Sequence, residues 1–317
     1  MNFHPAECQP PALNSPAMVD LVSSIEASDT LTPRRAAALL ASFSLSADAL
    51  APWAAFNHPP ADSYGRVLVH QGDSYELMVM SWAPGDMSAI HDHGQAQWGA
   101  VKVFGPAEHA CFAIRDECLV TTSRRRLDPG TVLPVSHQLI HQMGNVFEEP
   151  FLTLHLYGGD VGLAGVTSGA RIFEPESGQI ALTDGGVFYS LPDSMISDRS
   201  AGPRGDLATR LRDRIELMWR LMRMSGSLSL GRLQTAREIE LAQSLLAQGL
   251  AHEIEVELNA HQTERQGGCL RREMAAYAQI VGQLESMGLQ APNWAEGPGG
   301  VRDWIGSVGG RSNTALV

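Results

Sequence analysis

The chain has 317 residues, a formal net charge of -12, 44% hydrophobic residues and 18% charged residues, which is the composition of a folded globular protein. An acidic chain repels the phosphates of nucleic acid, and its short basic run, Arg124–Arg126, is interpreted as a solvated turn, so nucleic acid is not an expected partner. No stretch approaches the roughly 20 apolar residues of a membrane-spanning helix and the N-terminus has no targeting pattern, so we expect a cytoplasmic protein with no membrane partner.

Two helices are predicted after a proline-rich first stretch, at Met18–Ala27 and Pro33–Phe43. From Arg66 to about Tyr189 the sequence consists of short runs of aliphatic, β-branched and aromatic residues separated by Gly, Pro and Asp. Short strands of this kind are typical of a small antiparallel barrel or sandwich. The predicted strands are Arg66–Gln71, Tyr75–Trp82, Trp98–Phe104, Glu108–Ile114, Val132–Ser136, Ile140–Gly144 and Phe151–Tyr157, with weaker signals at Ala170–Phe173 and Gln179–Thr183.

After Pro203 the apolar residues recur at the period of a helix. Leu207, Leu211 and Ile215 fall on one helical face, and further helical periods follow as far as Met287. We therefore predict two domains, a strand-rich domain at 1–195 with an N-terminal helical arm and a helical domain of unknown role at 196–317. These C-terminal helices are also where we expect the contacts of a homo-oligomer, if the chain forms one.

The most informative segment is Gly85–His93, because it contains His91 and His93 separated by one residue. On a β-strand, residues i and i+2 project from the same face, so both imidazoles can bind one metal ion. A second segment, Gly130–Asn145, contains His141 in a strand-like run. The spacing within the two segments resembles the two cupin motifs. This resemblance implies a mainly β cupin fold, a small antiparallel barrel or jelly roll, here with N-terminal helices and an α-helical C-terminal extension.

Gln97 and Trp98 stand where cupins usually have a glutamate ligand, so the expected site contains three neutral imidazoles, from His91, His93 and His141. Three ligands on one face of an octahedral metal leave positions open for a substrate and oxygen. Because neutral ligands do not compensate the charge of iron(II), such a site favours an anionic soft donor, such as a thiolate.

Further motifs resemble the cysteine dioxygenase family over about Ala49–Tyr189. The matching segments are Tyr64-Gly65-Arg66, Ser88-Ala89-Ile90-His91-Asp92-His93 and Thr153-Leu154-His155-Leu156-Tyr157. By this resemblance, the three histidines bind iron(II). Arg66 holds the substrate carboxylate with Tyr64 close to it, and a guanidinium fork does match a carboxylate in geometry.

The resemblance also implies a role for Thr153, His155 and Tyr157, which alternate along one strand and form a hydrogen-bonded relay toward the oxygen site. Some family members carry a cysteine that becomes cross-linked to the relay tyrosine. Trp98 stands at that position, so we expect an unmodified Tyr157 and a cavity narrowed by Trp98 beside the metal. The Trp98-Gly99 pair resembles 3-mercaptopropionate dioxygenases, whereas the substrate arginine resembles cysteine dioxygenases, so the preferred thiol is left open.

The remaining histidines and cysteines are not assigned to the metal site. Cys111 and Cys118 are predicted to be structural thiols, and the four cysteines show no C-x-x-C pairing. The histidines that lack the motif spacing, and are therefore not predicted as ligands, are His58, His70, His109 and His137.

The sequence therefore predicts an iron(II) dioxygenase that uses O2 to oxidise a small carboxylate-bearing thiol, cysteine or a similar molecule, to its sulfinic acid. Two alternatives stay open. One is a cupin metalloenzyme that acts on a carboxylate without sulfur. The other is a non-catalytic cupin sensor whose C-terminal helices bind a partner.

Overall fold

The computed structural model describes residues 11–216, apart from gaps at 12, 14, 29, 59–61, 161–164, 185, 190, 192, 207, 211, 214 and 215. The chain divides into two units, one of residues 1–114 with 121–203 and one of residues 115–120 with 204–317. The predicted helical positions Leu207, Leu211 and Ile215 lie outside the described residues. The α-helical C-terminal domain therefore stays a prediction.

The first unit begins with the helices α1 (Pro16–Glu26), α2 (Pro33–Ser42) and α3 (Ala47–Leu50), followed by a 3-10 turn, η1 (Ala51–Trp53). Proline opens α1 and α2, where its missing N–H costs no hydrogen bond. A hydroxyl caps α2 as well, because the Thr32 side chain accepts from the backbone N–H of the third helical residue. The first two helices confirm the sequence prediction, whereas α3 and η1 are too short to have a clear period.

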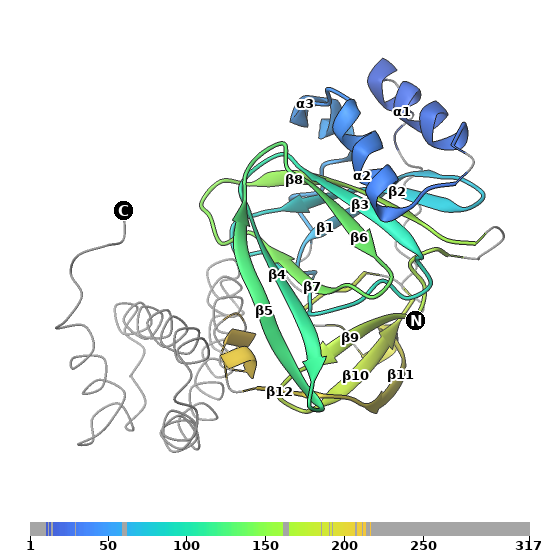
Figure 1. Ribbon diagram of the computed structural model, residues 1–317. Coiled ribbons are helices and arrows are strands. Elements are labelled where there is room, and N and C mark those ends of the chain that lie inside the picture. Colours follow the sequence, from blue (N-terminus) through green and yellow to red (C-terminus); the bar gives the residue numbers. More distant parts are fainter. Residues whose placement is uncertain are drawn as a thin grey trace. The chain divides into compact units, whose positions relative to one another are not determined.

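The strands form three groups of paired strands (Figure 1). A five-stranded sheet has the order β1-β2-β8-β3-β6, and a three-stranded sheet has the order β11-β10-β9, while β4 pairs with β5 and β7. The strands are β1 (Gly65–Gln71), β2 (Tyr75–Trp82), β3 (Trp98–Val103), β4 (Ala107–Arg115), β5 (Cys118–Leu127), β6 (Val132–Ser136), β7 (Ile140–Gly144), β8 (Phe151–Gly158), β9 (Ala170–Glu174), β10 (Gln179–Thr183) and β11 (Ile196–Ala201).

The central strands of the five-stranded sheet, β2, β8 and β3, are buried on both faces, and the alternation of their side chains separates two cores. On one face, Leu152, Leu154 and Leu156 of β8 pack with the apolar residues of the helices. On the other face, Phe151 and Tyr157 of β8 belong to a second cluster inside the barrel. Because both faces are covered, every residue of β2 and β8 is buried, and these include the polar residues Thr153 and His155.

A buried lysine fastens α2 to the sheet. Lys102 of β3 is 7% exposed, and its ammonium donates to the backbone oxygens of Leu40 at 3.1 Å and Phe43 at 2.6 Å. These carbonyls lie at the C-terminal end of α2, where a positive charge is favourable. The helices therefore cover one face of the sheet and leave the opposite face to form the barrel interior (Figure 1).

The predicted strands are all present, but β5 and β11 were missed. The segment Arg124–Arg126 is part of a strand and not a turn, although Arg125 and Arg126 are exposed as expected. These arginines lie in β5, where Arg124 donates to Glu108 of β4 at 2.6 Å. The Arg126 guanidinium lies 5.0 Å from the centre of the Phe147 ring. Glu108 and Phe147 thus provide contacts for the arginines of β5. Because both lie on other segments, the sequence around the arginines does not indicate them.

The strand β11 begins directly after the predicted domain boundary at 195, and it pairs antiparallel with β10. In the second unit, the short strand β12 (Arg204–Gly205) pairs in parallel with Cys118 and Leu119 at the beginning of β5. The division into domains at 1–195 and 196–317 stays a prediction, because most of the second range lies outside the described residues.

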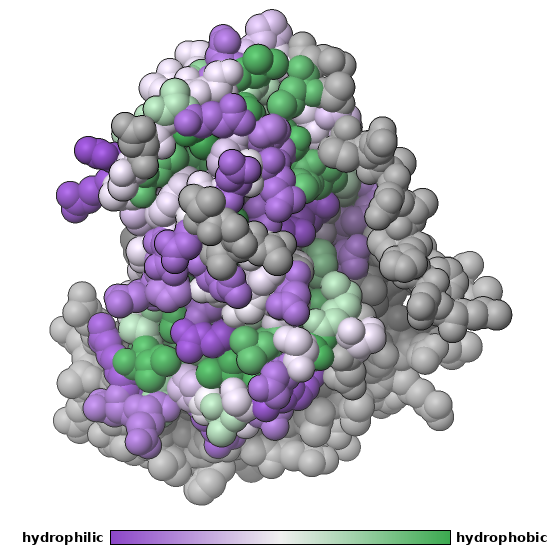
Figure 2. Space-filling view, turned by 90° about the vertical axis from the view of Figure 1, so that its right-hand side faces the viewer, coloured by the Kyte–Doolittle hydropathy of each residue, from purple (hydrophilic) through white to green (hydrophobic). Residues whose placement is uncertain are grey.

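Within the described part of the chain, no single helix is both long and apolar enough to cross a membrane; only a bent pair, Pro33–Ser42 with Ala47–Trp53, meets the criterion. Figure 2 shows hydrophilic residues interspersed with smaller groups of hydrophobic ones on one face. The large apolar side chains that are exposed among the described residues are Val19, Ile114, Val146 and Met195. They are far apart in the sequence, as is ordinary for a globular surface.

Asn145, the asparagine of the second cupin motif, provides a test of the fold. Its amide donates to the backbone oxygens of Trp82 and Glu149, and its oxygen accepts from the N–H of Phe147, while the residue is 1% exposed. Asn145→Ala should lower the free energy of unfolding by about 2–4 kcal/mol, because buried backbone groups lose their partners. Urea denaturation measures this change. Thr122→Ala, which removes an exposed hydrogen bond, should cost less than about 1 kcal/mol, and equal losses in both variants would contradict the assignment.

Candidate metal centre

Two of the predicted ligands are held side by side by their own backbones. The N–H of His91 donates to the oxygen of His141 at 3.0 Å, and the N–H of His141 donates to the oxygen of His91 at 2.9 Å. His141 lies on β7, whereas His91 lies in the segment between β2 and β3. This reciprocal pair of hydrogen bonds holds the two backbones side by side, and the two imidazole rings lie 4.6 Å apart between their centroids.

The segment around His91 and His93 differs from the predicted strand, because it forms isolated bridges rather than a continuous ladder. His91 bridges both His141 of β7 and Ile172 of β9, so the segment runs between two strands that belong to different sheets. The backbone is still extended enough to place residues i and i+2 near each other, with the rings of His91 and His93 5.3 Å apart.

Asp92 fixes the turn between these two histidines. It is 4% exposed, and its carboxylate accepts from the Arg171 guanidinium at 2.5 Å, from the Arg171 N–H at 2.9 Å and from the Gly94 N–H at 3.3 Å. Gly94 has φ +54°, and a Cβ atom there would lie 2.2 Å from the oxygen of Ser168. The residue after His93 must therefore be glycine for this loop to pack against β9.

The three histidines converge. His91, His93 and His141 each offer a ring nitrogen, and these nitrogens all lie within 4.8 Å of one another. The Nδ1 atom of His91 donates to the oxygen of Ala89 at 2.8 Å, which leaves Nε2 with its lone pair. Both ring nitrogens of His93 and the Nε2 of His141 are buried without a hydrogen-bond partner among the described residues.

Burial also keeps these rings neutral. Desolvation lowers the pKa of His91 to about 4 and the pKa of His93 and His141 well below the ordinary value. Neutral imidazoles with free lone pairs are the form that binds a metal, and unpartnered buried nitrogens are otherwise costly. The residues present therefore fit a divalent transition metal, as the sequence predicted from its donor set.

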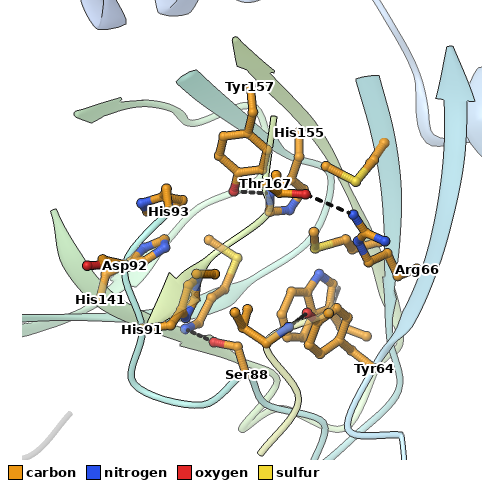
Figure 3. Close-up of a pocket in the computed structure, with 17 residues that line it drawn as sticks. Tyr64, Arg66, Ser88, His91, Asp92, His93, His141, His155, Tyr157 and Thr167 are labelled. Carbon is orange, nitrogen blue, oxygen red and sulfur yellow. Dashed lines mark hydrogen bonds between the residues drawn. The ribbon is translucent and has the colours of Figure 1, made fainter. Parts of the chain in front are cut away.

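A cavity adjoins the three histidines, and Figure 3 shows them on one side of it with Arg66 on the other. The lining is largely apolar, and it includes three methionines whose flexible thioethers suit contact with an organic or sulfur-containing ligand. The residues that line the cavity are Tyr64, Arg66, Met78, Met80, Trp82, Ser88, His91, Asp92, His93, His141, Met143, His155, Tyr157, Thr167, Ala170, Gly186 and Val187.

The relay predicted along β8 is a continuous chain of hydrogen bonds. Thr153 Oγ1 lies 2.7 Å from His155 Nε2, and His155 Nδ1 lies 2.9 Å from the Tyr157 hydroxyl. The indole N–H of Trp82, which can only donate, bonds Thr153 Oγ1 at 2.8 Å. The Thr153 hydroxyl has no other hydrogen-bond acceptor for its proton among the described residues, so it donates to His155, and the N–H of His155 donates to Tyr157.

This direction leaves the Tyr157 hydroxyl proton available to the cavity. Burial lowers the pKa of His155 to about 3 and raises the pKa of Tyr157, so both groups are neutral near pH 7. Tyr157 can thus donate a hydrogen bond into the site without first losing its proton. Trp82, which sequence reasoning did not assign, donates to the far end of this relay at Thr153.

Arg66 reaches the cavity from β1, and neighbouring residues orient it. Its guanidinium donates to Thr167 Oγ1 at 3.3 Å and lies 4.0 Å from the Glu76 carboxylate. Glu76 is 7% exposed, and it accepts from the Thr167 hydroxyl at 3.0 Å and from the N–H of Val166 at 3.1 Å. Sequence reasoning missed Glu76 and Thr167, because they lie far from any motif.

Tyr64 lines the same cavity, but its contacts are structural. Its ring stacks on Trp82 at 4.8 Å between centroids, and its hydroxyl accepts from the N–H of Val187 at 3.1 Å. Burial raises the pKa of Tyr64 to about 12, so the hydroxyl stays protonated. Tyr64 therefore shapes the wall of the cavity next to the arginine.

Trp98 requires a correction, because it does not appear in the cavity lining and lies on the other face of the sheet. It stands opposite Gly158, and it packs with the core beneath the helices. The neighbouring Gly99 stands opposite Tyr157, and a Cβ atom at Gly99 would lie 2.6 Å from the tyrosine ring. Counting residues from the histidines misplaced the position beside Tyr157 by one, which reverses the face of a strand.

Part of the chain is similar to known proteins. Residues 9–160 match the family model of cysteine dioxygenase type I. Cysteine dioxygenase type 1 of Bos taurus is 29% identical over 113 residues, and that of Homo sapiens is 30% identical over 111 residues. These matches cover 34% and 33% of this chain and 56% of each relative, so the chain spans about half the length of the curated relatives it matches.

Solved structures with barrel folds are also similar. A Klebsiella pneumoniae protein described as having a double-stranded beta-helix domain is 20% identical, with a TM-score of 0.28, and the match covers 34% of this chain and 82% of that one. A Cupin 2 conserved barrel domain protein from Salinispora arenicola is 20% identical, with a TM-score of 0.25, and the match covers 31% and 76%. The mainly β cupin fold predicted for the strand-rich region is confirmed by its strands and by the family match.

The ligand set predicts how metal binding responds to substitution. Wild-type protein should bind about one iron(II) per chain, and His91→Ala, His93→Ala or His141→Ala should each abolish stable binding, because two imidazoles hold the ion too weakly. Metal analysis after gel filtration measures this stoichiometry. His70→Ala changes a histidine that contacts Glu26, so it should bind iron like the wild type. A full complement of iron in His141→Ala would show that β7 supplies no ligand.

Proposed function

We propose, from the premise that residues 9–160 belong to the cysteine dioxygenase family, that this chain is a thiol dioxygenase with iron(II) bound by His91, His93 and His141. Its substrates would be molecular oxygen and a small thiol that carries a carboxylate, cysteine or a similar molecule. The reaction RSH + O2 → RSO2H balances without another oxidant or an organic cofactor, and it stops at the sulfinic acid.

One observation carries this function. A buried centre of three neutral imidazoles opens into the same cavity as a guanidinium and the hydroxyl of a buried tyrosine. A carboxylate-bearing thiol is complementary to this arrangement, since its sulfur suits the metal and its carboxylate suits the arginine. Figure 3 shows these groups on different sides of the cavity, as a substrate with two recognition points requires.

Bound iron(II) would supply the open coordination positions at which a thiolate and oxygen react. The chain's own residues position the substrate. Arg66 binds the carboxylate through its planar fork, and Glu76 with Thr167 holds the guanidinium in place. The apolar lining, including Met78 and Met80, excludes water and strengthens that charge-assisted contact.

Tyr157 donates its hydroxyl hydrogen bond toward the reacting atoms, with His155 holding the phenol oxygen at 2.9 Å. Because the Trp82–Thr153–His155 chain orients the phenol before substrate binds, this donor needs no reorganisation during the reaction. The raised pKa of Tyr157 keeps the proton on the phenol, so the residue acts as a hydrogen-bond donor.

Two broader expectations stay proposals. The protein is expected to be cytoplasmic, and 196–317 is expected to form a helical domain that supports a homo-oligomer. Light scattering of the full chain measures the oligomeric state. Neither expectation affects the chemistry proposed for the cavity.

The function is tested by an oxygen electrode with iron-loaded protein and a panel of cysteine, cysteamine, homocysteine and 3-mercaptopropionate. Oxygen uptake with at least one carboxylate-bearing thiol, together with its sulfinic acid detected by mass spectrometry, is expected. Iron binding without any thiol oxidation would favour a cupin enzyme for a carboxylate without sulfur. Absence of both would favour the non-catalytic sensor.

Arg66→Ala should raise KM for the preferred carboxylate thiol by about tenfold to a thousandfold, because a charge-assisted bidentate contact is worth roughly 1.5–3 kcal/mol, and more when it is desolvated. Arg66→Lys keeps the charge but loses the fork, so its KM should lie between those of the wild type and the alanine variant. Iron content should stay unchanged in both. Steady-state kinetics that are unaltered for every carboxylate thiol would disprove the anchoring role.

Gly99 and Trp98 form a matched pair, because they are neighbours on β3 that face opposite sides of the sheet. Gly99→Ala places a methyl group 2.6 Å from the Tyr157 ring and should lower kcat by about tenfold to a hundredfold, since a displacement of this kind disturbs the reacting geometry. Trp98→Phe should reduce thermal stability and leave kcat nearly unchanged. If kcat fell in Trp98→Phe and stayed unchanged in Gly99→Ala, Trp98 and not Gly99 would be the residue that faces the cavity.

Tyr157 should remain an ordinary phenol after turnover, because the residue facing it is Gly99, which has no thiol. Intact-protein mass spectrometry after aerobic turnover should give the mass encoded by the sequence. A loss of two hydrogens, with a modified peptide that contains Tyr157, would contradict this expectation.

A further inference from the structure

His109 of β4 contacts one of the three candidate ligands directly. It is 3% exposed, and its Nε2 lies 2.9 Å from the Nδ1 of His141. Its other ring nitrogen, Nδ1, lies 3.8 Å from the sulfur of Cys111 on the same strand. Cys111 stands opposite His141 in the β4–β7 pairing, so the register of these two strands sets the arrangement.

The direction of the hydrogen bonds between His141, His109 and Cys111 follows because His141 needs a free lone pair on Nε2 to bind a metal. If Nε2 of His141 binds a metal, the proton of the neutral ring must be on Nδ1. His141 then donates to His109, whose Nε2 accepts, and the proton of His109 is on Nδ1, where it points at the Cys111 sulfur. Reversing these hydrogen bonds would place a proton on the His141 nitrogen that faces the other two ligands.

We propose that His109 is a positioning residue that holds His141 in its metal-binding tautomer and ring orientation, with Cys111 as the acceptor at the far end. This role rests on the metal site of the proposed function but not on the identity of the substrate. Groups that bond the second nitrogen of a ligating imidazole typically change metal affinity by about 10–100-fold when they are removed.

The three ligands differ in how they are oriented. His91 donates to a backbone oxygen, that of Ala89, and this contact survives any side-chain substitution nearby. His93 has no hydrogen-bond partner at either ring nitrogen among the described residues. Among the described residues, His141 is the only one of the three whose ring bonds to another side chain, that of His109. A substitution of His109 therefore removes a hydrogen bond from this ligand alone.

His109 is not a fourth ligand in this arrangement. Its Nε2 is engaged by His141, and it is not part of the group of ring nitrogens that converge within 4.8 Å. The competing explanation is a purely structural one, in which His109 fills space between β4 and β7. An experiment must therefore separate hydrogen bonding from packing.

The test compares His109→Leu, which removes the acceptor, with His109→Gln, whose side-chain oxygen can still accept from His141. Apoprotein is titrated with Co(II) without thiol or oxygen, and the visible absorption of the bound ion gives the dissociation constant and the ligand geometry. We expect about 10–100-fold weaker binding and an altered spectrum in His109→Leu, with His109→Gln closer to the wild type. His137→Leu is the matched control, because His137 bonds the oxygen of Ala96 and should bind Co(II) normally.

Equal losses in the leucine and glutamine variants, or unchanged affinity in both, would overturn the role of His109. If His109→Leu does not fold, nitrogen-15 NMR of the wild-type zinc form still decides the matter, because it reports the protonated nitrogen of each imidazole. A proton on Nδ1 of both His109 and His141 is expected. A proton on Nε2 of His109 would refute the proposal, whereas failure of the oxygen-uptake assay alone would affect only the dioxygenase assignment.

Discussion

The site depends on one local interaction, the pair of backbone hydrogen bonds that His91 and His141 exchange. It joins the segment between β2 and β3 to β7, and it places the backbones of two of the histidines side by side. The same segment also bonds β9 through Ile90 and Asp92, so it is fixed on both sides. The backbone that carries two of the three candidate ligands is therefore held in place by its own hydrogen bonds, as a metal site with fixed geometry requires.

The two faces of the five-stranded sheet have different roles, since one packs against the helices and the other lines the cavity. Because its side chains alternate, one face of β8 packs with the helices while the other carries Thr153, His155 and Tyr157. The buried Lys102 and the apolar residues of α1 and α2 stabilise the first face. The second face lines the cavity, and for this reason the relay of β8 and Arg66 of β1 approach the histidines from strands of the same sheet, with β2 between them.

Much of this could be predicted from sequence, because the signals are local. Strands β1 to β4 and β6 to β8 have apolar runs bounded by turn residues, and His91 and His93 have a motif spacing. The missed features depend on contacts across strands. Glu76 reads as an ordinary strand carboxylate until Val166 and Thr167 pack against it, and His109 has no motif at all. The misplacement of Trp98 has the same origin, since the face of β3 is set by its pairing with β8.

We propose that three neutral imidazoles hold an iron(II) ion to which the thiolate of the substrate binds. X-ray absorption at the iron edge of anaerobic, iron-loaded protein, recorded with and without the preferred carboxylate thiol, measures these ligands. We expect a first shell of light scatterers with three imidazoles in the resting protein, and one additional sulfur scatterer when the thiol is present. A spectrum that the thiol leaves unchanged would show that the thiolate does not bind the iron, and a resting shell without the imidazole pattern would show that the three histidines are not its ligands.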